Sequence, residues 1–227
     1  MNINIVRLGL IDYKEAIEIQ EKLLALRQQD VIDDVFLLVE HPPVITVGRS
    51  GSYSNILLAD DRLKSAGVSI YEVSRGGDVT YHGPGQIVGY MIMDLNKHGR
   101  DIHKFVGKIG ELFIRLLKEE YNIDAGMDRG KYTGVWVGNE KITAIGISVK
   151  KWVTMHGFAF NVNTDMENFK WICPCGIKDR GVTSLMQLTK TTQDFEKLNG
   201  DVLNYFCKVF DLKPLEKDIS SLISKNV

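Results

Sequence analysis

Residues 132–163 constrain the fold most, because strand-forming segments follow one another there with hardly a break. The stretch reads YTGVWVGNEKITAIGISVKKWVTMHGFAFNVN. Gly138-Asn139 matches a two-residue hairpin turn and lies between β-branched and aromatic residues. Pairing across that turn places Lys141 at the start of a strand, opposite Trp136. The stretch therefore predicts antiparallel strands with a lysine at the mouth of a hairpin.

A second constraint is the glycine-rich segment SRGGDVTYHGPGQIVGY, residues 74–90, after which the chain becomes apolar. Glycine lacks a Cβ and tolerates a positive φ, so Gly76 and Gly77 indicate a shaped loop that another group approaches closely. Pro84-Gly85 suits the centre of a type II turn. The segment has neither the Walker A spacing nor the G-x-G-x-x-G spacing of dinucleotide folds, which argues against phosphate. A tight connection between strands is the simplest interpretation, but the many polar groups favour a binding loop.

Hydrophobic periodicity predicts the remaining elements. Helices are predicted over residues 12–24, 102–117 and roughly 191–210. Strands are predicted over residues 35–41, 44–49, 68–74 and 86–95. Gln20 lies in the apolar stripe of the first helix, where we expect a hydrogen-bonded core amide. Because strands and helices mix without a regular βαβ rhythm, the predicted fold class is α+β, with mixed sheets and packed helices in a single domain over residues 1–227.

Composition limits the classes of function. The chain has 227 residues, a formal net charge of −1 and three cysteines. The near-neutral charge argues against a general nucleic-acid-binding protein. The sequence has no long apolar run and begins without a basic n-region, so we expect a cytoplasmic protein with reduced thiols and no membrane segment. Cys207 falls in the last predicted helix and is most simply a small buried apolar residue.

The other two cysteines lie in the segment NFKWICPCGIKDRGVTSL, residues 168–185. Cys173 and Cys175 could bind a metal together with His82 and His156, although C-x-C lacks the C-x-x-C pairs of structural zinc sites. Alternatively, one of them is a nucleophile, because a loop cysteine with a cation near it becomes a thiolate at neutral pH. The residues alone leave both interpretations open.

Five blocks together are more specific than any one of them: LLVEHPPVITVGR, RGGDVTYHGPGQIVGY, KITAIG, HGFAFNVN, and PCGI followed by GVTSL. With these blocks in this order, the chain resembles the lipoyl(octanoyl) transferases of the biotin and lipoate protein ligase superfamily over nearly its whole length. The resemblance implies that Cys175 of PCGI is the acyl-accepting nucleophile and that Lys141 of KITAIG is its catalytic partner. It also implies substrate contacts from Arg75, Gly76, Gly77, Asp78, Val79, Thr80, Tyr81, His82, Ala144, Ile145, Gly146, Gly157, Phe158 and Ala159. Cys173 lies outside the PCGI block.

The resemblance implies ping-pong acyl transfer in lipoate biosynthesis. Cys175 would take an octanoyl group from octanoyl-acyl carrier protein and pass it to a lysine of a lipoyl domain, with Lys141 as the base. The implied acceptors are the lipoyl domains of 2-oxoacid dehydrogenase complexes and the glycine cleavage H protein. No cofactor, metal, nucleic acid or membrane is implied. The alternatives are an ATP-dependent lipoate or biotin protein ligase of the same superfamily, and a non-catalytic acyl- or metal-binding module.

The same resemblance gives the glycine-rich segment a ligand. It would close around the acyl chain, for which small residues such as Gly76 and Ala144 leave room. Thr80 and His82 would orient the thioester end, although hydrogen bonds that merely stabilise the loop would also explain them. We interpret His156 as structural, because nothing in the sequence places it beside Cys175.

Overall fold

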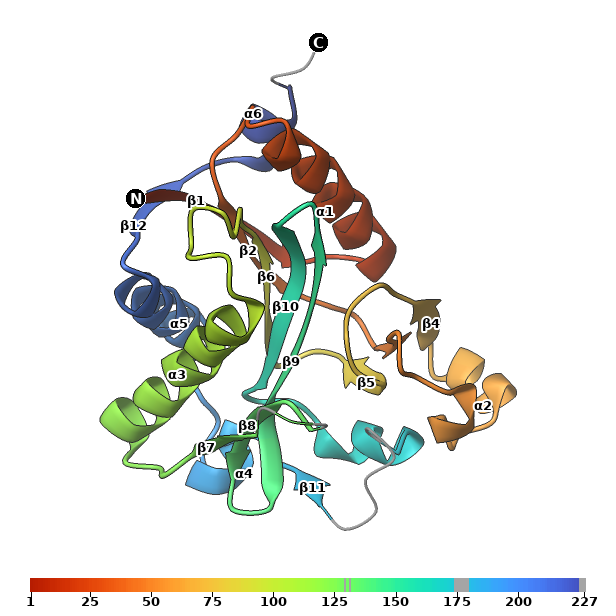
Figure 1. Cartoon of the computed structure of the whole chain (residues 1–227). Coiled ribbons are helices and arrows are strands. Elements are labelled where there is room, and N and C mark those ends of the chain that lie inside the picture. Colours follow the sequence, from red (N-terminus) through yellow and green to blue (C-terminus); the bar gives the residue numbers. More distant parts are fainter. Residues whose placement is uncertain (129, 131, 174–179, 225–227) are drawn as a thin grey trace.

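A mixed nine-stranded sheet runs through the molecule (Figure 1). The computed structural model describes residues 1–128, 130, 132–173 and 180–224. The strand order is β12–β1–β2–β6–β10–β9–β8–β7, and β11 pairs with β9 off this path. The strands are β1 (Asn2–Leu10), β2 (Val35–Glu40), β6 (Gln86–Ile92), β7 (Gly126–Asp128), β8 (Gly134–Val137), β9 (Glu140–Lys150), β10 (Val153–Asn161), β11 (Gly181–Val182) and β12 (Lys213–Glu216). β1 pairs in parallel with both β2 and β12, whereas the order from β2 to β7 is antiparallel.

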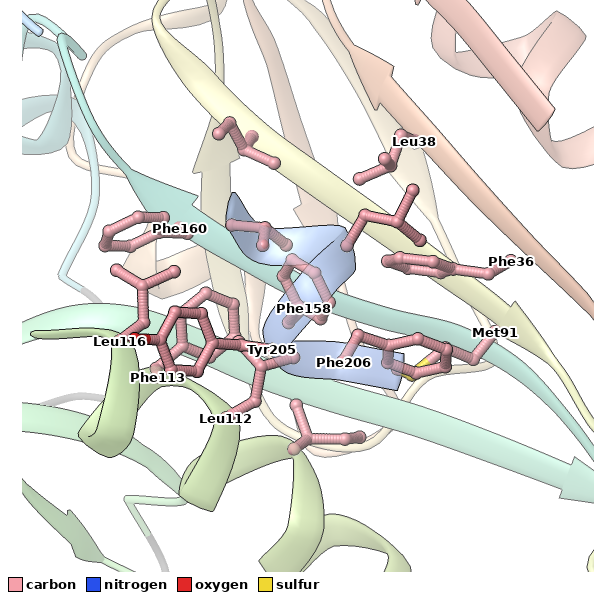
Figure 2. Packing of buried hydrophobic residues seen from close by; sticks show 14 of the residues in the cluster. Phe36, Leu38, Met91, Leu112, Phe113, Leu116, Phe158, Phe160, Tyr205 and Phe206 are labelled. Atoms are coloured by element: carbon pink, nitrogen blue, oxygen red, sulfur yellow. The ribbon is translucent and has the colours of Figure 1, made fainter. Parts of the chain in front are cut away.

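Helices cover both faces of this sheet. Figure 1 shows α3 (Ile102–Tyr121) and α5 (Phe195–Phe210) together on one face, and α1 (Tyr13–Gln28) on the other. Because side chains alternate along a strand, β2 sends Phe36 towards α5 and Leu37 towards α1. The α3–α5 layer is rich in aromatic residues (Figure 2), and the rings of Phe36 and Phe206 stack with their centroids 4.3 Å apart. The short α6 (Ile219–Ile223) lies beside α1.

A second sheet has the strand order β4–β3–β5. Its strands are β3 (Val44–Val47), β4 (Ser69–Glu72) and β5 (Val79–His82). A separate apolar cluster packs beneath it, to which the 3₁₀ helix η2 (Met166–Trp171) contributes Phe169. The 3₁₀ helix η1 (Tyr53–Asn55) and the helices α2 (Asp60–Ser65) and α4 (Leu185–Thr189) complete the described elements. The small sheet matters for function because it carries the glycine-rich segment.

The predicted fold class, α+β, is confirmed, as is the hairpin turn at Gly138-Asn139. Gly138 has a φ of +57°, and Trp136 pairs with Lys141. The last long helix begins at Phe195 rather than near residue 191, because the Asp194 side chain accepts a hydrogen bond from the backbone N–H of Lys197 and caps the helix there. The glycine-rich segment is not one loop, since Val79–His82 form β5 within it.

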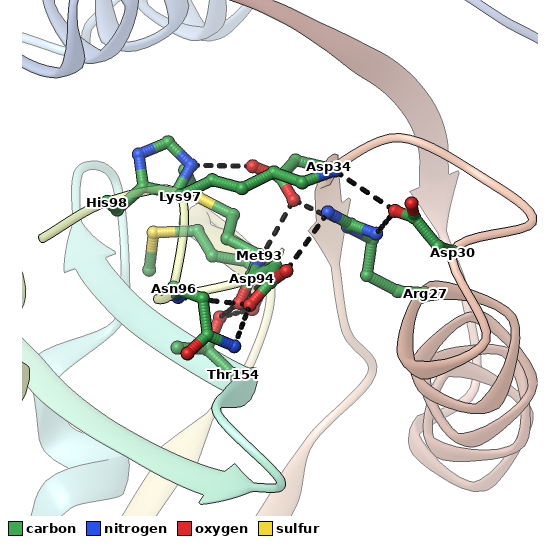
Figure 3. A network of polar contacts seen from close by, with 10 residues as sticks. Arg27, Asp30, Asp34, Met93, Asp94, Asn96, Lys97, His98 and Thr154 are labelled. Atoms are coloured by element: carbon green, nitrogen blue, oxygen red, sulfur yellow. Dashed lines mark hydrogen bonds and ion pairs between the residues drawn. The ribbon is translucent and has the colours of Figure 1, made fainter. Parts of the chain in front are cut away.

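A buried charge network ties the end of α1 to the large sheet (Figure 3). Arg27 Nε donates to Asp34 Oδ1 over 2.7 Å, and both side chains are at most 5% exposed. The other carboxylate oxygen of Asp34 lies 2.6 Å from His98 Nε2, and Arg27 also contacts Asp30 and Asp94. Asp34 precedes β2 and Asp94 follows β6, so the network joins a helix to two strand ends. Among the helices of the described residues, none has the length and apolar character that crossing a bilayer requires.

Candidate active site

A cavity of about 500 Å³ lies where the glycine-rich segment meets β6, β9 and β10. Lys141 and all the predicted substrate-contact residues except Tyr81 line it. Tyr81 instead belongs to the core beneath the small sheet, where its hydroxyl accepts a hydrogen bond from Asn168 Nδ2 over 2.9 Å. Cys175 lies outside the described residues. The structure therefore gathers residues from three separate sequence blocks around one space.

The glycine-rich segment was predicted to approach another group closely, and it approaches two other segments of the backbone. Gly76 N–H donates to Ile147 O of β9 over 3.0 Å, and Gly77 O accepts from Ser50 N–H over 3.1 Å. A Cβ on Gly48 would overlap Gly77 O, and Gly77 itself has a φ of +84°. The glycines thus let two chain segments cross while they also line the cavity.

The Arg75 side chain stabilises the place where these backbone segments cross. Its Nη2 donates to Thr46 O over 2.8 Å and to Thr46 Oγ1 over 2.7 Å, while Nη1 donates to Gly76 O over 3.0 Å. The guanidinium is buried, and at least these donors are used within the protein. Arg75 also lines the cavity, and these contacts stabilise the loop from within.

Three buried histidines line or adjoin the cavity and are uncharged at neutral pH. Burial lowers the pKa of His41 to about 4 and those of His82 and His156 to about 3. His41 Nδ1 lies 2.8 Å from Ile11 O and must donate to it, so His41 Nε2 accepts from the hydroxyl of Tyr90 over 2.7 Å. The cavity wall is thus polar but carries no imidazolium on these residues.

His156 is more than the structural residue that we predicted, because it also lines the cavity. It has a φ of +63°, which is costly for a residue other than glycine. Its backbone N–H donates to Gln20 Oε1 over 3.0 Å, which confirms Gln20 as a hydrogen-bonded core amide. Gln20 Nε2, however, has no hydrogen-bond partner among the described residues.

A β-bulge determines on which face of the sheet the Lys141 side chain lies. Val135 pairs with Thr143 and Trp136 with Lys141, so β9 has one more residue than β8 between the two pairs, namely Ile142. Ile142 joins the core under α3, as does Ile145 three residues later. Regular alternation would put residues 142 and 145 on opposite faces, so the bulge resets the strand and lets Lys141 share the cavity with Ala144.

The surroundings of Lys141 connect it to the cysteine-bearing segment. The side chain is 8% exposed, with Nζ 3.4 Å from Thr133 O and 5.0 Å from the centre of the Trp136 ring. Lys141 O accepts from the backbone N–H of Thr183 over 3.0 Å, where β11 pairs with the start of β9. β11 is the first strand after Cys175 among the described residues, and its pairing places Gly181 and Val182 beside the start of β9.

The other two cysteines differ in their surroundings. The backbone N–H of Cys173 donates to Asn55 O over 2.7 Å. Cys207 is half-buried against the α3–α5 core, and burial raises the pKa of its thiol to about 11. That environment agrees with the expected apolar packing role of Cys207.

Several cavity residues escaped the sequence analysis, above all Tyr13, Gln86, Tyr90 and Asn161. Tyr13 occupied an apolar helix position and gave no functional signal. Gln86 and Asn161 were visible as polar residues at the ends of strongly apolar strands, which is a usable sign of a buried polar contact.

Known proteins share both the sequence and the fold. A family model described as the lipoyl protein ligase A/B catalytic domain matches residues 12–207. An octanoyltransferase of Caldicellulosiruptor bescii is 61% identical, with 92% of each chain covered. An octanoyltransferase of Desulforamulus reducens is 56% identical, with 94% of this chain and 93% of the relative covered.

Solved structures match the whole architecture at low identity. Lipoate-protein ligase A bound with ATP has a TM-score of 0.75 at 15% identity, over 99% of this chain and 94% of that one. A bipartite lipoate protein ligase of Thermoplasma acidophilum, studied with its E2 lipoyl domain, gives 0.75 at 14% identity, over 99% of this chain and 91% of that one. These matches show the fold, and the sequence matches show the family. The chain therefore belongs to the lipoyl protein ligase A/B catalytic domain family, among its octanoyltransferases.

Proposed function

We propose that this chain takes an octanoyl group from octanoyl-acyl carrier protein, holds it as a thioester on Cys175, and delivers it to a lysine of a lipoyl domain. The chain is an acyltransferase of lipoate biosynthesis, as its octanoyltransferase relatives indicate. One observation carries the proposed mechanism. A buried lysine, Lys141, lines an acyl-sized cavity, and its backbone pairs with β11, the first strand after Cys175 among the described residues.

The cavity suits an acyl chain. Ligand pockets typically measure about 300–1,000 Å³, and this one measures about 500 Å³. Facing residues of β9 and β10 are small where they pair, Ala144 with Ala159 and Gly146 with Gly157, and all four line the cavity. An octanoyl chain would bury about six methylenes at about 0.8 kcal/mol each, or roughly 5 kcal/mol in all.

The reaction has two balanced halves. In the first, the Cys175 thiol gives its proton to Lys141, the sulfur attacks the carrier's thioester carbon, and the carrier leaves as a thiol after taking that proton. In the second, the lipoyl lysine amine attacks the acyl-enzyme, Lys141 accepts a proton from that amine, and Cys175 takes the proton from Lys141 as it leaves as a thiol. An amide remains on the acceptor.

The proposed acceptors are the lipoyl domains of 2-oxoacid dehydrogenase complexes and the glycine cleavage H protein. We propose that residues 1–227 work as a single catalytic domain in the cytoplasm, without a metal or another cofactor. Because the thioester already supplies the activation, the reaction needs no nucleotide.

Intact-mass measurement tests this mechanism. Wild-type protein mixed with octanoyl-acyl carrier protein should gain one octanoyl group, and peptide mapping should place it on Cys175. Cys175→Ala should gain none, whereas the matched variants Cys173→Ala and Cys207→Ala should label normally. A label on either of those two cysteines, or none at all, would refute the assignment.

The same sample separates transferase from ligase. Adding a lipoyl domain without ATP or magnesium should move the label to its lysine. An absolute requirement for ATP would favour the acyl-adenylate chemistry of a ligase and overturn the proposal.

Gly134→Ala should lower octanoyl transfer about 10-fold to 100-fold, because small displacements of catalytic groups have such effects. A Cβ at Gly134 would lie 2.6 Å from Thr143 O and 3.2 Å from both Cδ and Cε of Lys141, so the lysine must move. Gly126→Ala in the neighbouring β7 is the matched control, since a Cβ there meets nothing within 4 Å. Equal activity of the two variants, measured at equal folded fraction, would show that Lys141 tolerates displacement.

A further inference from the structure

Four buried polar residues form a continuous hydrogen-bonded chain between the cavity and the segment that follows Cys175. His82 Nδ1 lies 2.7 Å from Gln86 Oε1, and Gln86 Nε2 lies 2.8 Å from Asn161 Oδ1. Asn161 Nδ2 lies 3.0 Å from the backbone carbonyl oxygen of Thr183. All four residues are buried, so water does not compete for these contacts.

The direction of every hydrogen bond in this series follows from its last member, the backbone carbonyl of Thr183. A backbone carbonyl can only accept, so the nitrogen of the Asn161 amide must face Thr183 O and its oxygen must face Gln86. The Gln86 nitrogen therefore donates, both to Asn161 Oδ1 and to Tyr81 O at 3.3 Å. Rotating either amide would bring two acceptors together in a buried site.

This leaves Gln86 Oε1 as an acceptor facing His82, whose Nδ1 must carry the proton. The hydrogen bond at one ring nitrogen of a neutral histidine decides which nitrogen is protonated. His82 is neutral, because burial first and the nearby His41 second lower its pKa to about 3. Its Nε2 therefore carries a lone pair, and no described residue donates a hydrogen bond to it. His82 lines the cavity, and Nε2 is its ring nitrogen without a hydrogen bond from a described residue, so Nε2 can accept one from a ligand there.

The lone pair on His82 Nε2 can accept a hydrogen bond from only one of the two reacting substrates. Around the reacting carbon, the acyl thioester has an oxygen and a sulfur, both without a proton to donate. The lysine amine of the acceptor brings N–H groups to the same carbon. An acceptor fixed in the cavity therefore fits the second half of the reaction rather than the first.

We propose that Gln86 and Asn161 are positioning residues that hold His82 as a hydrogen-bond acceptor for the attacking lysine amine. This rests on the proposed function, because it assumes an acyl-enzyme that an amine attacks. It also assigns His82 to amine transfer rather than to orienting the thioester. Through Thr183, the amide pair links this acceptor to the residue that follows β11.

The first test is the protonation of His82 in the wild-type protein. Nitrogen-15 correlation spectra of the imidazole rings, assigned with His82→Gln, should show His82 protonated on Nδ1 and bare on Nε2 from pH 6 to pH 8. A proton on Nε2 would overturn the proposal. This measurement does not need Cys175, so it can succeed or fail independently of the acylation test above.

The second test separates the two half-reactions with Gln86→Glu. One carboxylate oxygen keeps the hydrogen bond from Nδ1 and raises the pKa of His82, so that Nε2 gains a proton as the pH falls. The other oxygen replaces the nitrogen that donates to Asn161 Oδ1, so both half-reactions are compared with wild type at equal folded fraction. We expect Cys175 acylation within twofold of wild type, and transfer to the lipoyl domain at least about 10-fold slower at pH 6, recovering towards pH 9.

Gln187→Glu is the control for this variant, because it makes the same chemical change at an exposed residue that contacts Thr183 Oγ1 and does not line the cavity. It should leave both half-reactions and the His82 spectrum unchanged. Equal loss of acylation and transfer in Gln86→Glu, or transfer that does not depend on pH, would contradict the positioning role.

Discussion

Lys141→Ala should slow the acylation of Cys175 about 25-fold or more at pH 7 and much less at pH 9.5. A free thiol with a pKa of about 8.5 is only about 3% ionised at pH 7, whereas one lowered by two units is about 75% ionised. That shift requires about 2.7 kcal/mol. An ammonium about 4 Å away, at an effective dielectric constant of about 20, interacts with a thiolate by roughly 4 kcal/mol before desolvation is subtracted. A single lysine is therefore sufficient.

Alkylation of Cys175 as a function of pH measures this effect directly. The Lys141→Ala profile should shift to higher pH than the wild-type profile. Lys141→Arg should keep the thiolate but lose the base, so it should alkylate like wild type and transfer poorly to the lipoyl domain. An unchanged titration in Lys141→Ala would mean that another group activates the cysteine.

Arg27→Met should lower the free energy of unfolding by about 3–5 kcal/mol, the usual cost of removing one partner from a buried ion pair. Asp34 would stay buried without the guanidinium that now lies 2.7 Å from it. Urea denaturation measures the loss. Arg7→Met is the matched control, because Arg7 contacts Glu216 at 3.4 Å with both side chains exposed, and such pairs contribute about 0–1 kcal/mol.

The pH dependence of stability checks the same network. Burial raises the pKa of Asp34, but the hydrogen bonds from His98 and Arg27 outweigh it and lower the pKa below its ordinary value. The stabilisation is therefore present above the unfolded pKa of about 3.9 and disappears as the pH falls through the folded pKa. The difference in stability between wild type and Arg27→Met should therefore be largest near neutral pH and shrink as the pH falls, because protonated Asp34 no longer needs the guanidinium. A loss below about 1 kcal/mol at pH 7 would mean that the network contributes little.

Local patterns predicted those parts of the fold that depend on neighbouring residues. The Gly138-Asn139 turn alone determined that Trp136 faces Lys141, and the helical periodicity located α3. Contacts between distant segments were not predictable in this way. β12 pairs with β1 across almost the whole chain, and its sequence KPLE shows no alternation and contains a proline.

The candidate site likewise has features that the sequence predicted and features that it could not predict. Resemblance supplied many of the residues that line the cavity but not Gln86 or Asn161, and the pattern of the glycine-rich segment predicted a close approach. Which groups approach each other could not be predicted, because Gly48 and Ile147 come from other elements. The direction of the bonds between Gln86 and Asn161 depends on a carbonyl of Thr183, which only the folded structure brings there.

The bulge at Ile142 makes the enzyme sensitive to the number of residues in β8 relative to β9. Inserting one residue into β8 between Val135 and Trp136 would give Ile142 a partner and restore regular alternation, and Lys141 would then no longer share a face with Ala144. The hairpin and the core beneath it could still form, but the lysine would point into the apolar layer or shift the strand out of register. A single-residue insertion at this point should therefore abolish activity, whereas substitutions in the hairpin that keep its residue count should be tolerated more easily.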